Sequence, residues 1–255
     1  MTRPQPSAEE SLDHLAGDWR IFQLKKGHRF STDDLMTAWV AAQSRPDSQR
    51  LLDLGSGIGS VGLLTLWRME TSARLTTLEV QTLSTGLARR TVEYNGLQSR
   101  VQIWDGDLRD PLPFPASPPF DLITGSPPYI PAHKGVQSPH PQKAAARIEL
   151  HGDVFDYCRT AAQALAPDGR FCFCHAAADP RPEPAIEAAG LRLLQRRDVV
   201  FRADQPPLIA LFVCALSGER RDAPPFFIRG NDGQWTDEYL AMRAAMGTVV
   251  WRKEA

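Results

Sequence analysis

Residues 51–62 read Leu51-Leu52-Asp53-Leu54-Gly55-Ser56-Gly57-Ile58-Gly59-Ser60-Val61-Gly62. A short apolar run containing an acid is followed by closely spaced glycines and then by apolar residues at helical spacing. This order predicts a strand, a tight turn and a helix. Glycine lets the backbone of the turn come close to a ligand, and the first amides of the helix offer hydrogen-bond donors. The segment therefore predicts both a fold and a binding site.

The same alternation repeats along the chain. We expect helices at residues 58–69, 82–94 and 153–165, and strands at residues 50–54, 75–79, 101–104, 120–124 and 170–174. Strands and helices that alternate at this length predict an α/β fold with a parallel sheet covered on both faces. Two more strand-like runs, 191–201 and 208–216, are separated only by residues 202–207 and predict a hairpin. The expected architecture is a doubly wound, mostly parallel seven-stranded sheet with a C-terminal antiparallel hairpin strand.

Composition and charge exclude several classes of protein. The 255 residues carry 29 Lys and Arg against 30 Asp and Glu, so no global field attracts nucleic acid or anionic lipid. The longest apolar run, 208–216, is about half the length of a membrane-spanning helix. The N-terminus has no apolar h-region of a secretory signal. We expect a cytoplasmic protein with no membrane partner, and the sequence leaves the oligomeric state open while slightly favouring a monomer.

The cysteines are expected to be core residues in a reducing compartment. Cys158, Cys172, Cys174 and Cys214 form no CxxC pair, and three of them lie among apolar neighbours in strand-like runs. Cys172, Cys174 and His175 lack a fourth ligand at zinc-like spacing. The sequence therefore predicts no metal site.

The glycines fit two ligand-binding patterns. Gly57-x-Gly59-x-x-Gly62 matches the dinucleotide fingerprint, with Glu79 22 positions after Gly57 as the ribose-binding acid. Asp53-x-Gly55-x-Gly57-x-Gly59 matches the S-adenosylmethionine loop of methyltransferases. A carboxylate at the strand end repels a pyrophosphate but suits a sulfonium ligand that carries an ammonium group. This charge argument favours S-adenosylmethionine as cofactor, with S-adenosylhomocysteine as product.

Two further acids extend this predicted cofactor site. Glu79 ends the strand expected at 75–79, and its carboxylate can accept hydrogen bonds from both ribose hydroxyls. Asp107 follows the strand expected at 101–104 and can accept from an adenine amino group, with Asp105 as the competing candidate.

The segment Ser126-Pro127-Pro128-Tyr129 follows the strand expected at 120–124, where open α/β sheets place their chemistry. Two successive prolines fix a rigid turn. The Ser126 side-chain oxygen and the Pro127 carbonyl can hold an amino group between two acceptors, which returns lone-pair density to its nitrogen. Tyr129 can stack on a planar base, a contact worth ~1 to 3 kcal/mol. Such chemistry requires neither a metal nor a dedicated strong base.

These motifs resemble those of class I amino-methyltransferases, whose hallmark is Asp, Asn or Ser followed by Pro-Pro-aromatic. Two more segments resemble the ends of the tRNA(Val) adenine-N6 methyltransferase family: Gln23-Leu24-Lys25-Lys26-Gly27-His28-Arg29-Phe30-Ser31-Thr32-Asp33-Asp34-Leu35-Met36 and Phe227-Ile228-Arg229-Gly230-Asn231-Asp232-Gly233-Gln234-Trp235-Thr236-Asp237-Glu238-Tyr239. The resemblance runs from about Gln23 to Met246. It implies a Rossmann-like class I methyltransferase fold and methylation of the adenosine immediately 3′ of the anticodon. That family usually carries Asn at the position of Ser126, so the target base stays open between adenine and cytosine.

The resemblance also implies roles for individual residues. The catalytic candidates are Ser126, Pro127, Pro128 and Tyr129. The cofactor-binding candidates are Asp53, Gly55, Gly57, Gly59, Glu79 and Asp107, with Thr32 and Asp33 closing over the methionine end. For the domain organisation we expect a flexible segment at 1–19, a substrate and cofactor cap at 20–49, the S-adenosylmethionine-binding core at 50–216, and an extension of the same domain at 217–255, with an edge strand at 226–228 and a helix at 236–246.

A local basic cluster suits a nucleic-acid substrate. Lys25, Lys26, His28 and Arg29 lie together with Phe30, a pattern that fits a phosphate backbone and a stacked base. We therefore expect tRNA as partner. The alternatives are glutamine-N5 methylation of a protein, N4-cytosine or other RNA or DNA amino-methylation, a nicotinamide-dependent oxidoreductase, and a non-catalytic RNA-binding module. The basic cluster disfavours the protein substrate. The Ser126 segment disfavours the oxidoreductase and the non-catalytic module.

Overall fold

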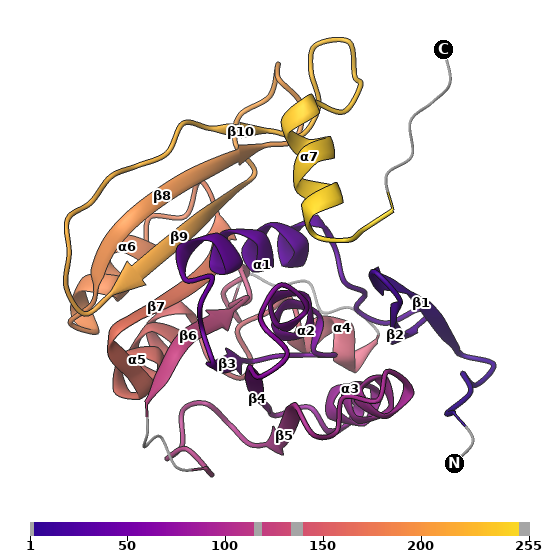
Figure 1. The fold of residues 1–255 in the computed structure, drawn as a ribbon. Helices are drawn as coiled ribbons and strands as arrows, with labels where there is room; N and C mark the ends of the chain where they lie inside the picture. Colours follow the sequence, from indigo (N-terminus) through magenta and orange to yellow (C-terminus); the bar gives the residue numbers. More distant parts are fainter. Residues whose placement is uncertain (1–2, 115–118, 134–139, 250–255) are drawn as a thin grey trace.

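The glycine-rich turn lies at the end of a central strand of a large sheet (Figure 1). The computed structural model describes residues 3–114, 119–133 and 140–249. The strands of the sheet are β3 (Arg50–Leu54), β4 (Arg74–Glu79), β5 (Val101–Asp105), β6 (Phe120–Gly125), β7 (Leu165–Ala176), β8 (Arg192–Val200), β9 (Ile209–Ala215) and β10 (Phe226–Phe227). Their order is β10-β8-β9-β7-β6-β3-β4-β5.

Strand directions confirm the predicted doubly wound fold. β9 runs antiparallel to both of its neighbours, β7 and β8, whereas the other neighbouring pairs are parallel. The hairpin expected from residues 191–216 is therefore present as β8 and β9. The seven expected strands are joined by an eighth, the short β10, which pairs with β8 as the edge strand expected at 226–228.

Helices cover both faces of the sheet. One apolar cluster includes residues of α1 (Thr32–Ser44), α2 (Ser60–Trp67), α3 (Thr82–Tyr94) and α7 (Asp237–Ala245). The other includes residues of α5 (Val154–Ala164) and α6 (Pro182–Ala188). A further short helix, α4 (Pro141–Ala145), lies between β6 and α5 in the chain. Side chains on β3 alternate between the clusters, Leu51 in the first and Leu52 and Leu54 in the second, as period-two strands require.

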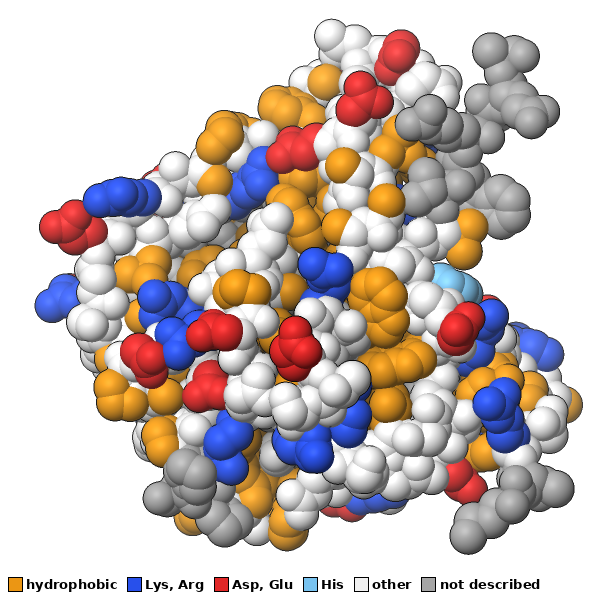
Figure 2. All heavy atoms as spheres, viewed as in Figure 1, with side chains coloured by type: hydrophobic (Ala, Val, Ile, Leu, Met, Phe, Trp, Pro, Cys, Tyr) orange, Lys and Arg blue, Asp and Glu red, His pale blue; other side chains and the backbone are white. Residues whose placement is uncertain are grey.

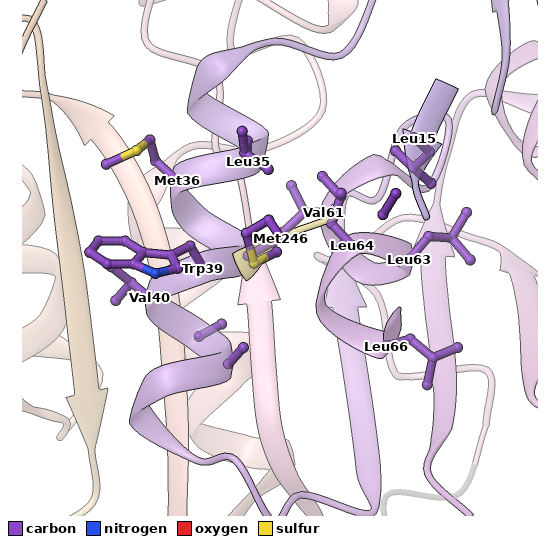
Figure 3. Packing of buried hydrophobic residues seen from close by; sticks show 14 of the residues in the cluster. Leu15, Leu35, Met36, Trp39, Val40, Val61, Leu63, Leu64, Leu66 and Met246 are labelled. Atoms are coloured by element: carbon purple, nitrogen blue, oxygen red, sulfur yellow. The ribbon is translucent and has the colours of Figure 1, made fainter. Parts of the chain in front are cut away.

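Packing between α1 and α2 fixes the helical layer next to the glycine turn. Leu35 of α1 faces Val61 and Leu64 of α2, with Met246 between the two helices, whereas Trp39 points to the opposite side of α1 (Figure 3). All five side chains are buried. Their burial stabilises the layer that carries the turn, at about 25 cal/mol per Å² of apolar surface removed from water.

The N-terminal segment differs from the sequence prediction. Residues 1–19 were expected to be flexible, but β1 (Glu10–Ala16) pairs antiparallel with β2 (Trp19–Leu24), and this hairpin lies beside α3 (Figure 1). The expectation is therefore wrong for residues 10–16. The physical reason is burial, because Leu15 and Phe22 are completely buried. The polar and proline-rich composition of the first residues gives no sign of this strand.

The described part of the chain contains no helix long and apolar enough to cross a membrane. Figure 2 shows basic and acidic side chains interspersed over the visible face, in keeping with the nearly balanced formal charge of −1. All four cysteines are buried and free, and Cys172 and Cys174 alternate in β7 with Phe171 and Phe173. They are core residues, as expected.

We predict that Asn95→Ala loosens the N-terminal hairpin. The Asn95 side chain accepts a hydrogen bond from the Arg20 backbone N–H at 2.9 Å and donates to the Arg20 carbonyl at 2.7 Å. Removing it leaves both groups of Arg20 without these partners, which should lower the free energy of unfolding by about 1 to 3 kcal/mol in urea denaturation. Gln98→Ala, at an exposed amide of the same turn, is the control and should change it by less than about 0.5 kcal/mol. Equal effects of both substitutions would contradict this role.

Candidate functional site

The glycine turn between β3 and α2 has a backbone that only glycine adopts easily. Gly55 and Gly57 have φ of 57° and 55°, in the left-handed region. A Cβ atom at Gly55 would also lie 1.8 Å from the hydroxyl oxygen of Tyr157 on α5, whereas a Cβ at Gly57 would meet open space. Gly55 is therefore required for close packing, and Gly57 for the shape of the turn.

Two buried carboxylates hold this turn in place. Asp53 accepts hydrogen bonds from the Gly62 N–H at 2.9 Å and from the Thr124 hydroxyl at 2.7 Å. Glu79, at the end of β4, accepts from the Gly57 N–H at 2.8 Å and from the Gln81 N–H at 2.7 Å. These acids therefore shape the binding loop as well as lining the cavity beside it.

We call that cavity the glycine-turn pocket. It is lined by the turn from Gly55 to Gly57, by Glu79, by Gly106 after β5 and by Tyr157. Asp34, in the first turn of α1, closes one side. Ser56 lines the pocket, and its buried hydroxyl oxygen has no hydrogen-bond partner among the described residues. A ligand in the pocket is one partner that such an atom could take.

The charge of the glycine-turn pocket suits a cation. Burial raises the pKa of Asp34 to about 7 and that of Asp53 to about 6, and it also raises the pKa of Glu79. Among the described residues, no Lys or Arg lines the pocket. A dinucleotide pyrophosphate would face these acids without a compensating charge, whereas a sulfonium ligand with an ammonium group relieves their desolvation. The donor set therefore fits S-adenosylmethionine.

The Pro-Pro-Tyr turn forms the wall of a second cavity, the Pro-Pro-Tyr pocket. Pro127 and Tyr129 line it, together with Phe30 before α1 and with Lys143 and Arg147 from α4 and the residues after it. Its volume of about 590 Å³ lies in the range of small-ligand sites.

Hydrogen bonds fix the side chains of this turn. The Tyr129 hydroxyl lies 3.2 Å from Asp33 Oδ2 and 3.0 Å from Cys174 Sγ. The Ser126 hydroxyl lies 3.3 Å from the same sulfur. Beneath them the Tyr129 ring packs against the completely buried His175, with 5.1 Å between ring centroids. The orientation of the tyrosine ring is therefore set by contacts at both ends.

The two pockets meet. Ser126 and Pro128 line both cavities, and so do His28, Asp34 and Ala146. Since β3 and β6 are neighbouring parallel strands, the glycine turn and the Ser126 turn leave the same edge of the sheet side by side. Ligands in the two pockets can thus touch at Ser126.

The structure separates the remaining predicted cofactor residues. Asp33 lines the Pro-Pro-Tyr pocket, and Thr32 lines a different cavity beside Arg243. Asp34, next to them in the chain, lines both the glycine-turn pocket and the Pro-Pro-Tyr pocket. The Asp107 carboxylate pairs with Arg109 at 2.5 Å, which lowers its pKa, while its neighbours Gly106 and Leu108 line the glycine-turn pocket.

The predicted basic cluster is also divided. His28, Arg29 and Phe30 line the Pro-Pro-Tyr pocket, although Arg29 also pairs with Asp13 at 2.9 Å. Lys25 and Lys26 are exposed at the end of β2, and the Lys25 ammonium donates to the Ala8 carbonyl at 2.8 Å.

Sequence reasoning missed several lining residues. Ser56 was inside the recognised loop but lacked an obvious role, and Asp34 was passed over for its neighbour Asp33. Tyr157 lies about a hundred positions from the turn that it packs against, and no local pattern in the sequence marks it.

A family model described as the methyltransferase small domain matches residues 30–177, more than half of the chain. The chain belongs to this family. It is 27% identical over 218 residues to a tRNA1(Val) (adenine(37)-N6)-methyltransferase of Cronobacter sakazakii, covering 83% of this chain and 84% of that protein. The protein of the same name from Salmonella choleraesuis is 25% identical over 219 residues, with 85% and 81% covered.

Solved structures support the same fold. A predicted O-methyltransferase from Agrobacterium tumefaciens aligns with a TM-score of 0.61 at 19% identity, over 86% of this chain and 98% of that chain. A ribosomal protein L11 methylase from Lactobacillus delbrueckii aligns with a TM-score of 0.51 at 12% identity, over 76% and 82%. This methyltransferase small domain protein therefore has the class I fold and is an S-adenosylmethionine-dependent methyltransferase.

We predict that Asp34→Asn stabilises the ligand-free protein as pH rises. Burial raises the Asp34 pKa from 3.8 to about 7, so the folded protein keeps the Asp34 proton at pH values where the unfolded chain has lost it. The stability that the protonated Asp34 contributes is therefore complete below about pH 4 and is lost as pH rises through about 7. Asparagine keeps an oxygen that can accept from the Ser31 N–H, 2.8 Å away in the wild type, but cannot ionise. In urea titrations the free energy of unfolding of the variant, relative to that of the wild type, should therefore increase between these pH values.

The control is Asp18→Asn, which removes an exposed carboxylate. Its difference from the wild type should stay the same across the range. A difference for Asp34→Asn that does not vary with pH would contradict the assignment.

Proposed function

We propose that this methyltransferase transfers a methyl group from S-adenosylmethionine to an exocyclic amino nitrogen of a tRNA base, adenine N6 beside the anticodon. The observation that carries the proposal is that the glycine-turn pocket and the Pro-Pro-Tyr pocket share Ser126 and Pro128. A methyl donor in the first pocket and a planar amine in the second would meet at the turn whose acceptors suit an amino group.

The cofactor would lie along the glycine turn. When bound, it supplies a methyl group activated by a positively charged sulfur. Ser56 offers a free hydroxyl, Glu79 offers the remaining lone pairs of its carboxylate to ribose hydroxyls, and Asp34 faces the cationic end. Asp107 would have to exchange its contact with Arg109 to receive an adenine amino group, and the neighbouring Leu108 offers apolar contact.

The acceptor base would enter the Pro-Pro-Tyr pocket. The Ser126 hydroxyl can donate to Cys174 and leave its lone pairs directed at an amino hydrogen, while the Pro127 carbonyl provides the second acceptor. Because the Tyr129 hydroxyl is held by Asp33 and Cys174, its ring is preorganised for stacking. These positions make amino-nitrogen chemistry the best account of the turn.

An RNA substrate fits the rim of this pocket. Arg29, Lys143 and Arg147 line it and are suited to phosphates, and Phe30 adds an aromatic surface. The relatives named above act on tRNA1(Val) at adenine 37, according to their names. Bases of an anticodon loop are unstacked or easily flipped, so that an amino group can reach the depth of the pocket.

A second candidate is methylation of cytosine N4. The observation that favours it is Ser126 itself, since a hydroxyl is shorter than the carboxamide usual in adenine-N6 enzymes and can also donate. Both reactions use the same donor and an exocyclic amine.

The deciding experiment is mass spectrometry of nucleosides from unmodified tRNA incubated with the protein and labelled S-adenosylmethionine. We expect label in N6-methyladenosine and none with a Tyr129→Ala variant that still binds the cofactor in calorimetry. Label in N4-methylcytidine would select the second candidate. Absence of label from tRNA together with methylation of a protein glutamine would overturn the proposal.

We predict that Lys143 and Arg147 contribute more to tRNA binding than Lys25 and Lys26. Replacing the first pair by Ala should raise KM at least tenfold and reduce the slope of log K against log salt, because phosphate contacts in single-stranded RNA each contribute about 0.7 to that slope. The Lys25→Ala, Lys26→Ala double variant is the charge-matched control. A larger loss for the control would move the RNA surface to the end of β2.

A further inference from the structure

Asp33 places a half-buried carboxylate in the wall of the Pro-Pro-Tyr pocket. It stands in the first turn of α1 and lines that pocket together with Ser126 and Tyr129. Asp33 Oδ2 accepts a hydrogen bond from the Tyr129 hydroxyl at 3.2 Å. A carboxylate beside the acceptor turn is placed to take a proton.

The carboxylate is connected to the turn that would hold the amine. Tyr129 bonds to Asp33 and to Cys174, and Cys174 bonds in turn to Ser126. The Asp33 carboxylate is therefore fixed relative to Ser126, although the two residues come from different elements.

We propose that Asp33 is a catalytic residue that accepts the proton released by the amino nitrogen during methyl transfer. This inference rests on the function proposed above. The nitrogen lone pair forms a bond to the methyl carbon, the carbon–sulfur bond breaks, and its electron pair stays on sulfur. The nitrogen, now positively charged, loses one of its two hydrogens as a proton, which binds to an Asp33 oxygen and later passes to water. Charge and atoms balance without any other reactant.

The surroundings suit this role. Burial raises the pKa of Asp33 above 3.8, so the carboxylate is a better base than an exposed aspartate. The groups that face it are the neutral Tyr129 and Cys174, the acid Asp34 on its own helix, and His28, Arg29, Lys143 and Arg147 around the pocket. The hydrogen bond from Tyr129 favours the ionised form of Asp33, which can accept a proton.

The neighbouring candidates are less suited. The Asp34 carboxylate already accepts from the Ser31 N–H in the N-terminal turn of α1, and it also lines the glycine-turn pocket. Burial lowers the pKa of His28, and Arg147 and Lys143 lower it further, so a proton on its ring is disfavoured.

The test compares Asp33→Asn with Tyr129→Phe in single-turnover methyl transfer to tRNA across a range of pH, at saturating cofactor. We expect Asp33→Asn to lower the rate at least ~100-fold, within the usual range for a general base, and to remove the acidic limb of the pH profile. Cofactor affinity in calorimetry should change less than twofold. Tyr129→Phe, which removes only the hydroxyl bonded to Asp33, should keep the acidic limb.

If Asp33→Asn keeps the wild-type rate or the acidic limb, or if Tyr129→Phe reproduces its whole effect, Asp33 only positions the tyrosine and the inference is overturned. A loss explained by cofactor affinity overturns it as well. Because the wild type is measured in the same assay, the two proposals fail separately. A wild type that methylates no tRNA removes the proposed function and this inference together, whereas an active wild type matched by Asp33→Asn removes only the inference.

Discussion

The carboxylate of Asp53 joins three elements that the site needs together. One oxygen accepts from the Gly62 N–H of α2, and the other accepts from the Thr124 hydroxyl of β6. Since Thr124 stands two positions before Ser126, a single buried side chain on β3 ties the glycine turn to the strand that carries the Pro-Pro-Tyr turn. Losing either bond would leave a buried acceptor unpaired, at a cost of about 1 to 3 kcal/mol, so the relative position of the two pockets is built into the core of the sheet.

Two other buried acids lie beside this link. Asp34, Asp53 and Glu79 all have a raised pKa because burial disfavours their charge, and each is held by backbone N–H groups that favour it. The balance leaves a negatively biased cavity without a basic partner among its described lining residues. A cationic cofactor supplies the missing positive charge. The unfavourable free energy of burying these acids is then partly offset when a sulfonium binds but not when a phosphate binds, which favours the sulfonium.

Much of this arrangement follows from local sequence. The β3 strand with its glycine turn, Glu79 at the end of β4 and the Ser126 turn after β6 are each read from a few adjacent residues, and parallel strands bring their carboxyl ends to one edge. What the sequence does not reveal depends on contacts between distant segments. Tyr157 of α5 packs against Gly55, and the hairpin of residues 10–24 is ordered by burial against α3, not by its own composition. Adjacent residues of a helix are rotated by about 100° from each other, so Asp33 and Asp34 face different parts of the two pockets. The spacing of residues in the sequence does not show which of the two acids faces which pocket.

That rotation has a chemical consequence. Two adjacent acids at the start of α1 stand at the junction of a donor pocket and an acceptor pocket, with Asp34 lining both cavities and Asp33 only the second. During a methyl transfer, positive charge disappears from the sulfur and appears on the nitrogen. A negative group can therefore stabilise charge first beside the sulfur and then beside the nitrogen. The helix N-terminus favours both carboxylates, so in the proposed reaction one helical turn would serve both ends of the methyl transfer. In the proposed reaction, Ser126, bonded to Cys174, would hold the amine beside the acceptor turn, whose pocket Asp33 also lines.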